Sequence, residues 1–178
     1  MRCDWRAPAA AAVIALVAAC GADPQRVDLI SAFDAVQKKP DPSFFAVGDV
    51  ALNNETKPAI SVTAAAGTRL IWKVRVPDDG WLNVAVGMKP EAWEQEGNGV
   101  LFMVGVSDGR TYDTLFTQHV NPFGAPADRR WIPVWVDVSA YGGEEVDVIL
   151  NTVAGPPGQE SDLRNDLAVW GDPAIVVR

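Results

Sequence analysis

Cysteine and histidine are scarce in this chain, and their scarcity excludes several kinds of chemistry. The 178 residues include two cysteines, Cys3 and Cys20, and one histidine, His119. Both cysteines lie near the N-terminus, so the body of the chain holds no catalytic thiol and no pair for an internal disulfide. A lone histidine cannot build a histidine-rich metal site. His119 alternates with Leu115 and Thr117, so we expect a strand or loop-edge residue without a catalytic role.

Basic residues are also few relative to acidic ones. The chain has 15 Lys and Arg against 23 Asp and Glu, which gives a formal net charge of −8. Proteins that bind nucleic acid need clustered Lys and Arg to displace counterions from phosphates. We therefore expect no nucleic-acid partner, and we interpret the acidic surface as a contribution to solubility.

Motifs of hydrolytic enzymes are missing. Ser139 opens the run S-A-Y-G-G, which lacks the G-x-S-x-G elbow that exposes a nucleophile. Adjacent carboxylates such as Glu144 and Glu145 fall in an expected turn, whereas glycosidases hold two carboxyl groups at a fixed separation across a cleft. We predict that the protein is not an enzyme and that it needs no cofactor.

The apolar run at Ala7–Ala19 is too short to span a bilayer. It follows Arg2 and Arg6 and ends in V-A-A-C, with Cys20 as the last residue. Small residues before a cysteine resemble the signal of bacterial lipoproteins, which implies that Cys20 becomes the acylated N-terminus. That resemblance places the protein at the cell envelope, on the periplasmic or outer-membrane face, held to the membrane by its lipid anchor alone. An ordinary secretory peptide cut nearby and a buried apolar helix are the alternatives.

Three segments follow from these patterns. They are a lipoprotein signal peptide at 1–19, a lipidated tether with a short helix at 20–43, and a β-sandwich domain at 44–178. In the second segment Asp28 can cap a helix and Pro40 stops it. Its apolar residues fall at helical spacing: Leu29, Ile30, Phe33 and Val36. The pattern predicts one amphipathic helix over 27–39 whose apolar face packs on an end of the sandwich.

From residue 44 onward the chain alternates at the period of a β-strand. Several short segments place apolar residues at every second position, as in Ile132, Val134, Val136 and Val138, and again in Val146, Val148 and Leu150. Turns rich in Gly, Pro and Asp separate these segments, and no long helix intervenes. The pattern predicts an all-β fold, an antiparallel β-sandwich or jelly roll with one core, and we expect a monomer.

Trp131 and Trp135 lie on the strand face opposite Ile132 and Val134. In a two-layer sandwich that face meets solvent unless a loop or helix covers it. Packing is the simplest role for both tryptophans and for Trp170, which we expect to cover an end of the core.

Four motifs resemble jelly-roll modules of the galactose-binding-like type, and especially the NPCBM-like carbohydrate-binding modules. They are P-D-D-G-W-L-N-V-A-V-G, E-G-N-G-V-L-F-M-V-G-V-S-D-G, D-R-R-W-I-P-V-W-V-D-V-S-A-Y-G-G-E-E-V and D-L-A-V-W-G-D-P-A-I. The resemblance covers about Phe45 to Val177. It implies sugar binding in loops at one end of the sandwich, and a structural calcium in some members. Leu167 departs from the pattern, because related segments often have an aromatic residue there.

A sugar site needs an aromatic face beside polar side chains. Trp93, in an acidic loop, is the tryptophan we most expect to be exposed. With the loop residues of the resemblance it gives the predicted ligand set: Trp93, Asp108, Arg129, Arg130 and Asp166. A structural role for the two arginines, pairing with a carboxylate or stacking on an indole to fix their loop, is the alternative.

Two functions remain open at this stage. The first is a non-catalytic envelope lipoprotein that binds a glycan through its β-sandwich. The second is a structural or protein-interaction lipoprotein that has lost sugar binding. A structural calcium could use acidic loops such as Asp78-Asp79, Asp108-Gly109 and Asp166, although none has EF-hand spacing.

Overall fold

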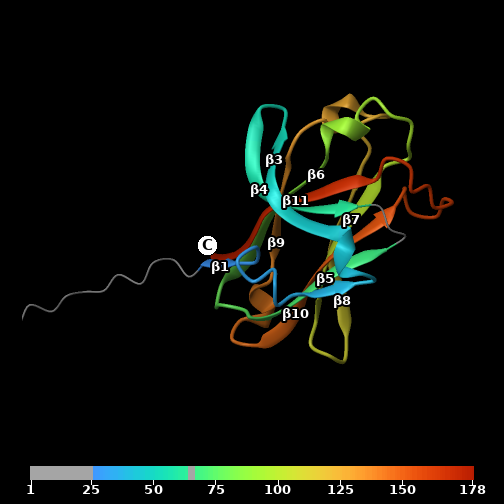
Figure 1. Ribbon diagram of the computed structural model, residues 1–178. Helices are drawn as coiled ribbons and strands as arrows, with labels where there is room; N and C mark the ends of the chain where they lie inside the picture. The colour runs from blue at the N-terminus through green and yellow to red at the C-terminus, as the bar shows by residue number, and fades with distance from the viewer. Residues whose placement is uncertain (1–25, 64–66) are drawn as a thin grey trace, which may run out of the picture.

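A computed structural model describes residues 26–63 and 67–178, and these residues form two antiparallel sheets packed face to face (Figure 1). The six-stranded sheet has the order β3-β4-β11-β6-β9, and β1 also pairs with β11. Its strands are β1 (Arg26–Asp28), β3 (Phe45–Leu52), β4 (Glu55–Thr63), β6 (Gly80–Met88), β9 (Ile132–Asp137) and β11 (Leu167–Val177).

The five-stranded sheet has the order β2-β5-β10-β7-β8. Its strands are β2 (Gln37–Lys39), β5 (Thr68–Arg75), β7 (Val100–Ser107), β8 (Tyr112–Val120) and β10 (Glu145–Ala154). Short 3₁₀ turns lie at Pro42–Phe44, Pro90–Ala92, Pro126–Asp128 and Ser139–Tyr141. In the described residues, no helical segment has the length and apolar character needed to cross a bilayer. The predicted all-β antiparallel sandwich is confirmed.

The core lies between the sheets and is built from the alternating apolar residues of both. Trp170 of β11 is buried there, and its ring meets that of Phe102 edge to face, with centroids 5.0 Å apart and planes at 80°. Such aromatic pairs add about 0.5–1.5 kcal/mol beyond the burial of their area. Trp170 is therefore a central core residue, and it does more than cover an end of the sandwich.

The helix predicted over 27–39 is wrong. The segment forms β1, a series of turns and β2, because the free edges of β11 and β5 offer backbone hydrogen bonds at both of its ends. Asp28 still caps the turns, since its carboxylate accepts the amide of Ile30 at 2.9 Å. Leu29 is fully buried, and its carbonyl accepts the indole N–H of Trp72 at 3.0 Å. The helical spacing reflected packing on the core, which the turns achieve equally well.

A second, smaller apolar cluster lies on the outer face of the six-stranded sheet. It consists of Leu52, Ala59, Ala85, Trp131 and Val169, with Val50 and Trp93 packed against it. The hairpin of β3 and β4 provides part of its cover, and this hairpin projects beyond the body of the sandwich at the upper left of Figure 1. Trp131 is consequently only 4% exposed, whereas Trp135 on the same face is 45% exposed. The tip of the hairpin therefore divides the outer face into a covered part and an open part.

Candidate functional site

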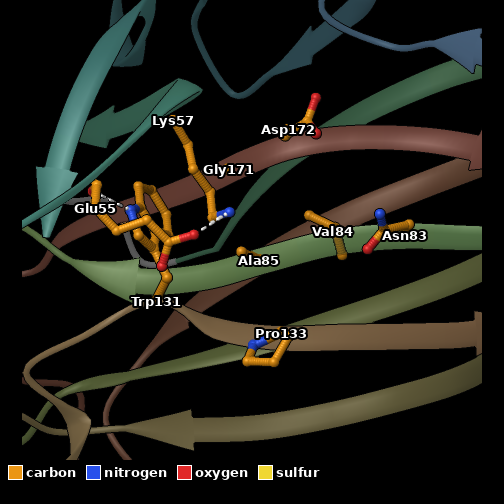
Figure 2. Close-up of a pocket in the computed structure, with 9 residues that line it drawn as sticks. All are labelled: Glu55, Lys57, Asn83, Val84, Ala85, Trp131, Pro133, Gly171 and Asp172. Atoms are coloured by element: carbon orange, nitrogen blue, oxygen red, sulfur yellow. Dashed lines mark hydrogen bonds and ion pairs between the residues drawn. The ribbon is translucent and has the colours of Figure 1, made fainter.

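A pocket of about 150 Å³ opens on the outer face of the six-stranded sheet, beside the projecting hairpin (Figure 2). Four strands and the loop before β9 contribute to its lining, which consists of Glu55, Lys57, Asn83, Val84, Ala85, Trp131, Pro133, Gly171 and Asp172. An engineered cavity of about 150 Å³ holds benzene, whereas drug-sized ligands occupy roughly 300–1,000 Å³. The pocket is therefore suited to one six-membered ring.

The pocket exists because one row of the sheet carries small side chains. Gly171 pairs with Ala85 across β11 and β6, and Ala85 pairs with Pro133 across β6 and β9. In β11 the register shifts between Gly171 and Ala174, and this bulge holds Asp172 at φ 45° at the side of the pocket. Trp131 and Asn83, which also line the pocket, are larger than the residues of this row, so the row forms the floor of a hollow.

Trp131 forms one wall and fixes the hairpin in place. Its indole N–H donates to the carbonyl of Glu55 at 3.0 Å. The ring lies directly over Gly171, where an added Cβ would come within 2.8 Å of Cζ3 of the indole. The close approach of indole and backbone therefore requires glycine at this position.

The rim of the pocket is polar. Lys57 Nζ lies 2.6 Å from Glu55 Oε1, and Figure 2 shows this pair reaching down from the hairpin toward β6. Across the pocket, Asp172 pairs with Arg26 at 2.7 Å. The half-buried Asn83 makes no side-chain hydrogen bond to another described residue, so its amide can donate to and accept from a ligand.

The loop residues predicted to bind a sugar are placed differently. Trp93 is half-buried, donates its indole N–H to the carbonyl of Met88 at 2.8 Å, and packs against the outer apolar cluster. Arg129 lies beside it and donates to the Trp93 carbonyl at 3.0 Å, to the Pro122 carbonyl at 3.0 Å and to Glu94 at 2.7 Å. The structure thus brings Trp93 and Arg129 together, in the loop-fixing arrangement that was the structural alternative for the arginine.

The other three predicted ligand residues are Arg130, Asp108 and Asp166, and none of them makes a hydrogen bond to the side chain of Trp93 or Arg129. Arg130 is exposed and donates to the carbonyl of Ala127 at 3.2 Å. Asp108 lies in the β7–β8 hairpin, at the opposite end of β7 from the Trp93 loop. Its carboxylate accepts the amides of Thr111 and Arg110 at 2.8 Å each, and these bonds lower the pKa of Asp108. The five residues do not share one surface, and their role in ligand binding stays a prediction.

Asp166 is buried at the start of β11. Its side chain is almost inaccessible, and neither carboxylate oxygen has a hydrogen-bond partner among the described residues. Burial raises the pKa of Asp166 to about 7, and the charge of Asp162 adds to the effect. An acid in this environment is neutral over much of the acidic range, and it affects stability more directly than it can contact a ligand.

The one histidine of the sequence does not line the pocket. His119 lies on β8, as predicted, and its Nε2 is 2.7 Å from the carbonyl of Asn98. Within residues 26–63 and 67–178, no group of three or more His, Cys, Asp or Glu side chains is arranged to hold a metal ion. Cys20 and the leader lie outside the described residues.

Sequence reasoning missed Asn83 and the Glu55–Lys57 pair. The signal was present in part, because Trp131 was placed on the face opposite the core, with a loop or helix as its expected cover. What the sequence could not supply was the register that sets Gly171 beside Ala85 and brings a hairpin from 76 residues earlier onto the indole.

Sequence comparison finds a relative that matches part of the chain. No family model matches the sequence. A relative from Archaeoglobus fulgidus, an uncharacterized protein, is 33% identical over 104 residues. The match covers 58% of this chain and 25% of the relative, so the chain spans about a quarter of the length of that protein.

Solved structures with a similar fold include carbohydrate-binding modules. CBM51-2 with the INT domains of Clostridium perfringens ZmpB, in complex with GlcNAc, has a TM-score of 0.56 at 15% identity, covering 85% of this chain and 31% of that one. TmCBM61 in complex with β-1,4-galactotriose has a TM-score of 0.53 at 11% identity, covering 85% and 94%. The chain therefore has the galactose-binding-like jelly-roll fold that the sequence motifs predicted.

Proposed function

We propose that the protein is a non-catalytic envelope lipoprotein that binds carbohydrate in the pocket on the outer face of its six-stranded sheet. The observation that carries this proposal is the pocket itself, which matches one six-membered ring and combines an indole wall with a polar rim. Its fold is shared with modules whose structures contain GlcNAc or β-1,4-galactotriose. Fold alone does not imply a ligand, so the proposal depends on the chemistry of the lining.

That chemistry suits a neutral sugar ring. The amide of Asn83 offers both a donor and an acceptor to ring hydroxyls. Lys57 and Glu55 already satisfy each other at 2.6 Å, so a hydroxyl can join the pair without leaving a charge unpaired. Ala85 and Pro133 present an apolar floor to the C–H face of the ring, beside the Trp131 indole that covers Gly171.

A structural or protein-interaction lipoprotein is the second candidate. One observation favours it: in the predicted loop site, Trp93 and Arg129 donate hydrogen bonds to backbone carbonyls of the protein instead of to a ligand. In this case the exposed Trp135 would contact an envelope protein.

A glycan array with neutral, acidic and sulfated glycans, probed with and without calcium, separates the two candidates. Carbohydrate binding predicts at least one hit that is lost in Asn83→Ala and in Ala85→Leu, whose larger side chain fills the pocket. Thr117→Ala, an exposed change on β8 of the other sheet, is the matched control and should bind normally. Silence across the array, with an envelope protein that co-purifies, would support the second candidate.

A further inference from the structure

Two tryptophans and an arginine form an aromatic platform next to the pocket. The guanidinium carbon of Arg178 lies 5.1 Å from the ring centroid of Trp81 and 5.1 Å from that of Trp135. A guanidinium at this distance is attracted by the negative face of an indole. Trp135 remains 45% exposed, so the Trp135 platform, defined as Trp81, Trp135 and Arg178, is accessible to a ligand.

The platform is continuous with the pocket. Trp135 is the direct cross-strand partner of Asn83, and it lies two residues along β9 from Pro133. Asn83 and Pro133 both line the pocket. Residues two apart on a strand share a face and are separated by roughly 7 Å. Pocket and platform are therefore neighbours on the outer face, with no strand between them, and we call the two together the extended site.

The charges around this extended site are unevenly paired. Around the pocket, Lys57 is paired with Glu55 and Arg26 with Asp172. Asp137, opposite Trp81, accepts from the amide and hydroxyl of Ser139 at 2.9 and 2.6 Å. Arg178 makes no ion pair with an Asp or Glu side chain of residues 26–63 or 67–178. Among the described residues around the pocket and the platform, its guanidinium is thus the cation left for an anionic ligand.

We propose that the extended site binds a uronate-containing oligosaccharide, with one ring in the pocket and a neighbouring uronate ring on the Trp135 platform. This proposal rests on the proposed function and specifies the ligand class of the same site. A carboxylate matches the planar fork of a guanidinium and accepts two parallel hydrogen bonds from it. The exposed part of the Trp135 indole, beside the guanidinium, supplies the apolar surface for the C–H face of that second ring.

The negative net charge of the protein does not oppose this ligand at close range. Charges on exposed surface are largely screened beyond about 8 Å at physiological ionic strength. A carboxylate that bonds directly to the Arg178 guanidinium is closest to that positive charge, whereas Asp137, on the same face opposite Trp81, acts from farther away.

Isothermal titration of the purified protein with matched trisaccharides tests the proposal. The probes are galacturonate against galactose and glucuronate against glucose, and at least one acidic member should bind about tenfold or more tightly than its neutral partner. Arg178→Ala should remove that preference, so that the acidic and the neutral member of a pair bind with equal affinity. Trp135→Ala should weaken both members of the pair, and Asn83→Ala should do the same. Arg110→Ala, an exposed arginine in the β7–β8 hairpin, is the control and should behave as the wild type.

Three results would overturn the inference. Equal affinity for acidic and neutral probes would do so, as would an acidic preference that survives Arg178→Ala or binding that is insensitive to Asn83→Ala. In the first two cases pocket binding of a neutral sugar still stands. If neither these probes nor any array glycan binds, the proposed function fails together with the inference.

Discussion

Trp131 donates its indole N–H to the carbonyl of Glu55, 3.0 Å away and 76 residues earlier in the chain. The bond joins the loop before β9 to the tip of the β3–β4 hairpin. It therefore holds Glu55 and Lys57 at the edge of the pocket, and its removal should affect both the stability of the domain and the shape of the site.

Two substitutions of Trp131 should separate the stability that comes from its hydrogen bond from the stability that comes from its packing. Trp131→Phe removes the hydrogen bond and should cost about 1 kcal/mol, whereas Trp131→Ala also empties the outer cluster and should cost about 3–5 kcal/mol. Urea unfolding followed by circular dichroism measures both. Trp135→Ala, at an exposed position of the same face, should cost less than about 1 kcal/mol. If Trp131→Ala costs no more than this control, the hairpin is not held by the indole.

Gly171→Ala should strain the floor of the pocket. Its Cβ would lie 2.8 Å from Cζ3 of Trp131, and a crowded site of this kind costs about 1–3 kcal/mol. Gly48→Ala on β3 is the matched control, because an added Cβ there meets nothing within 4 Å. The unfolding midpoints of the two variants should therefore shift differently, and equal midpoints would contradict the packing described for Gly171.

The stability of the domain should depend on pH through Asp166. Its folded pKa of about 7 lies above its ordinary value of 3.8, so its protonated form is favoured by folding. The contribution of Asp166 to the free energy of unfolding is fully present below pH 3.8 and is lost as the pH rises through about 7. Its upper bound is about 1.4 kcal/mol per unit of pKa shift.

Asp166→Asn should remove this loss, so that the variant is more stable than the wild type above pH 7. Asp34→Asn, at an exposed aspartate, is the control and should follow the wild-type profile. Unfolding midpoints measured between pH 4 and pH 8 provide the comparison. If the pH profile of Asp166→Asn runs parallel to that of the wild type, the pKa of the Asp166 carboxyl is not raised in the folded protein.

The lipid anchor is tested separately from the fold. Cys20→Ser should release the protein from the detergent phase into the soluble fraction, because the acylated residue is replaced. A control change at the neighbouring Gly21 to Ser should leave membrane partitioning as it is. Detergent partitioning that is unchanged by Cys20→Ser would disprove lipidation at this position.

Strand periodicity predicted the sandwich because alternation depends on neighbours only two residues apart. The prediction of a helix over 27–39 was wrong for the opposite reason. The two ends of this segment pair with β11 and β5, which are strands distant in the sequence. The same limit applies to Trp131 and Trp135, which carry identical local signals. Only the fold of the β3–β4 hairpin buries the first and leaves the second open.

The central claim is that carbohydrate occupies the pocket at Ala85 and Gly171. An NMR titration of the ¹⁵N-labelled protein with an array hit locates the ligand directly. The account predicts that the side-chain amide of Asn83, the indole N–H of Trp131 and the backbone amide of Ala85 shift together and saturate with one affinity. Shifts confined to the loops around Trp93 and Arg129, with the resonances of the pocket unchanged, would contradict it.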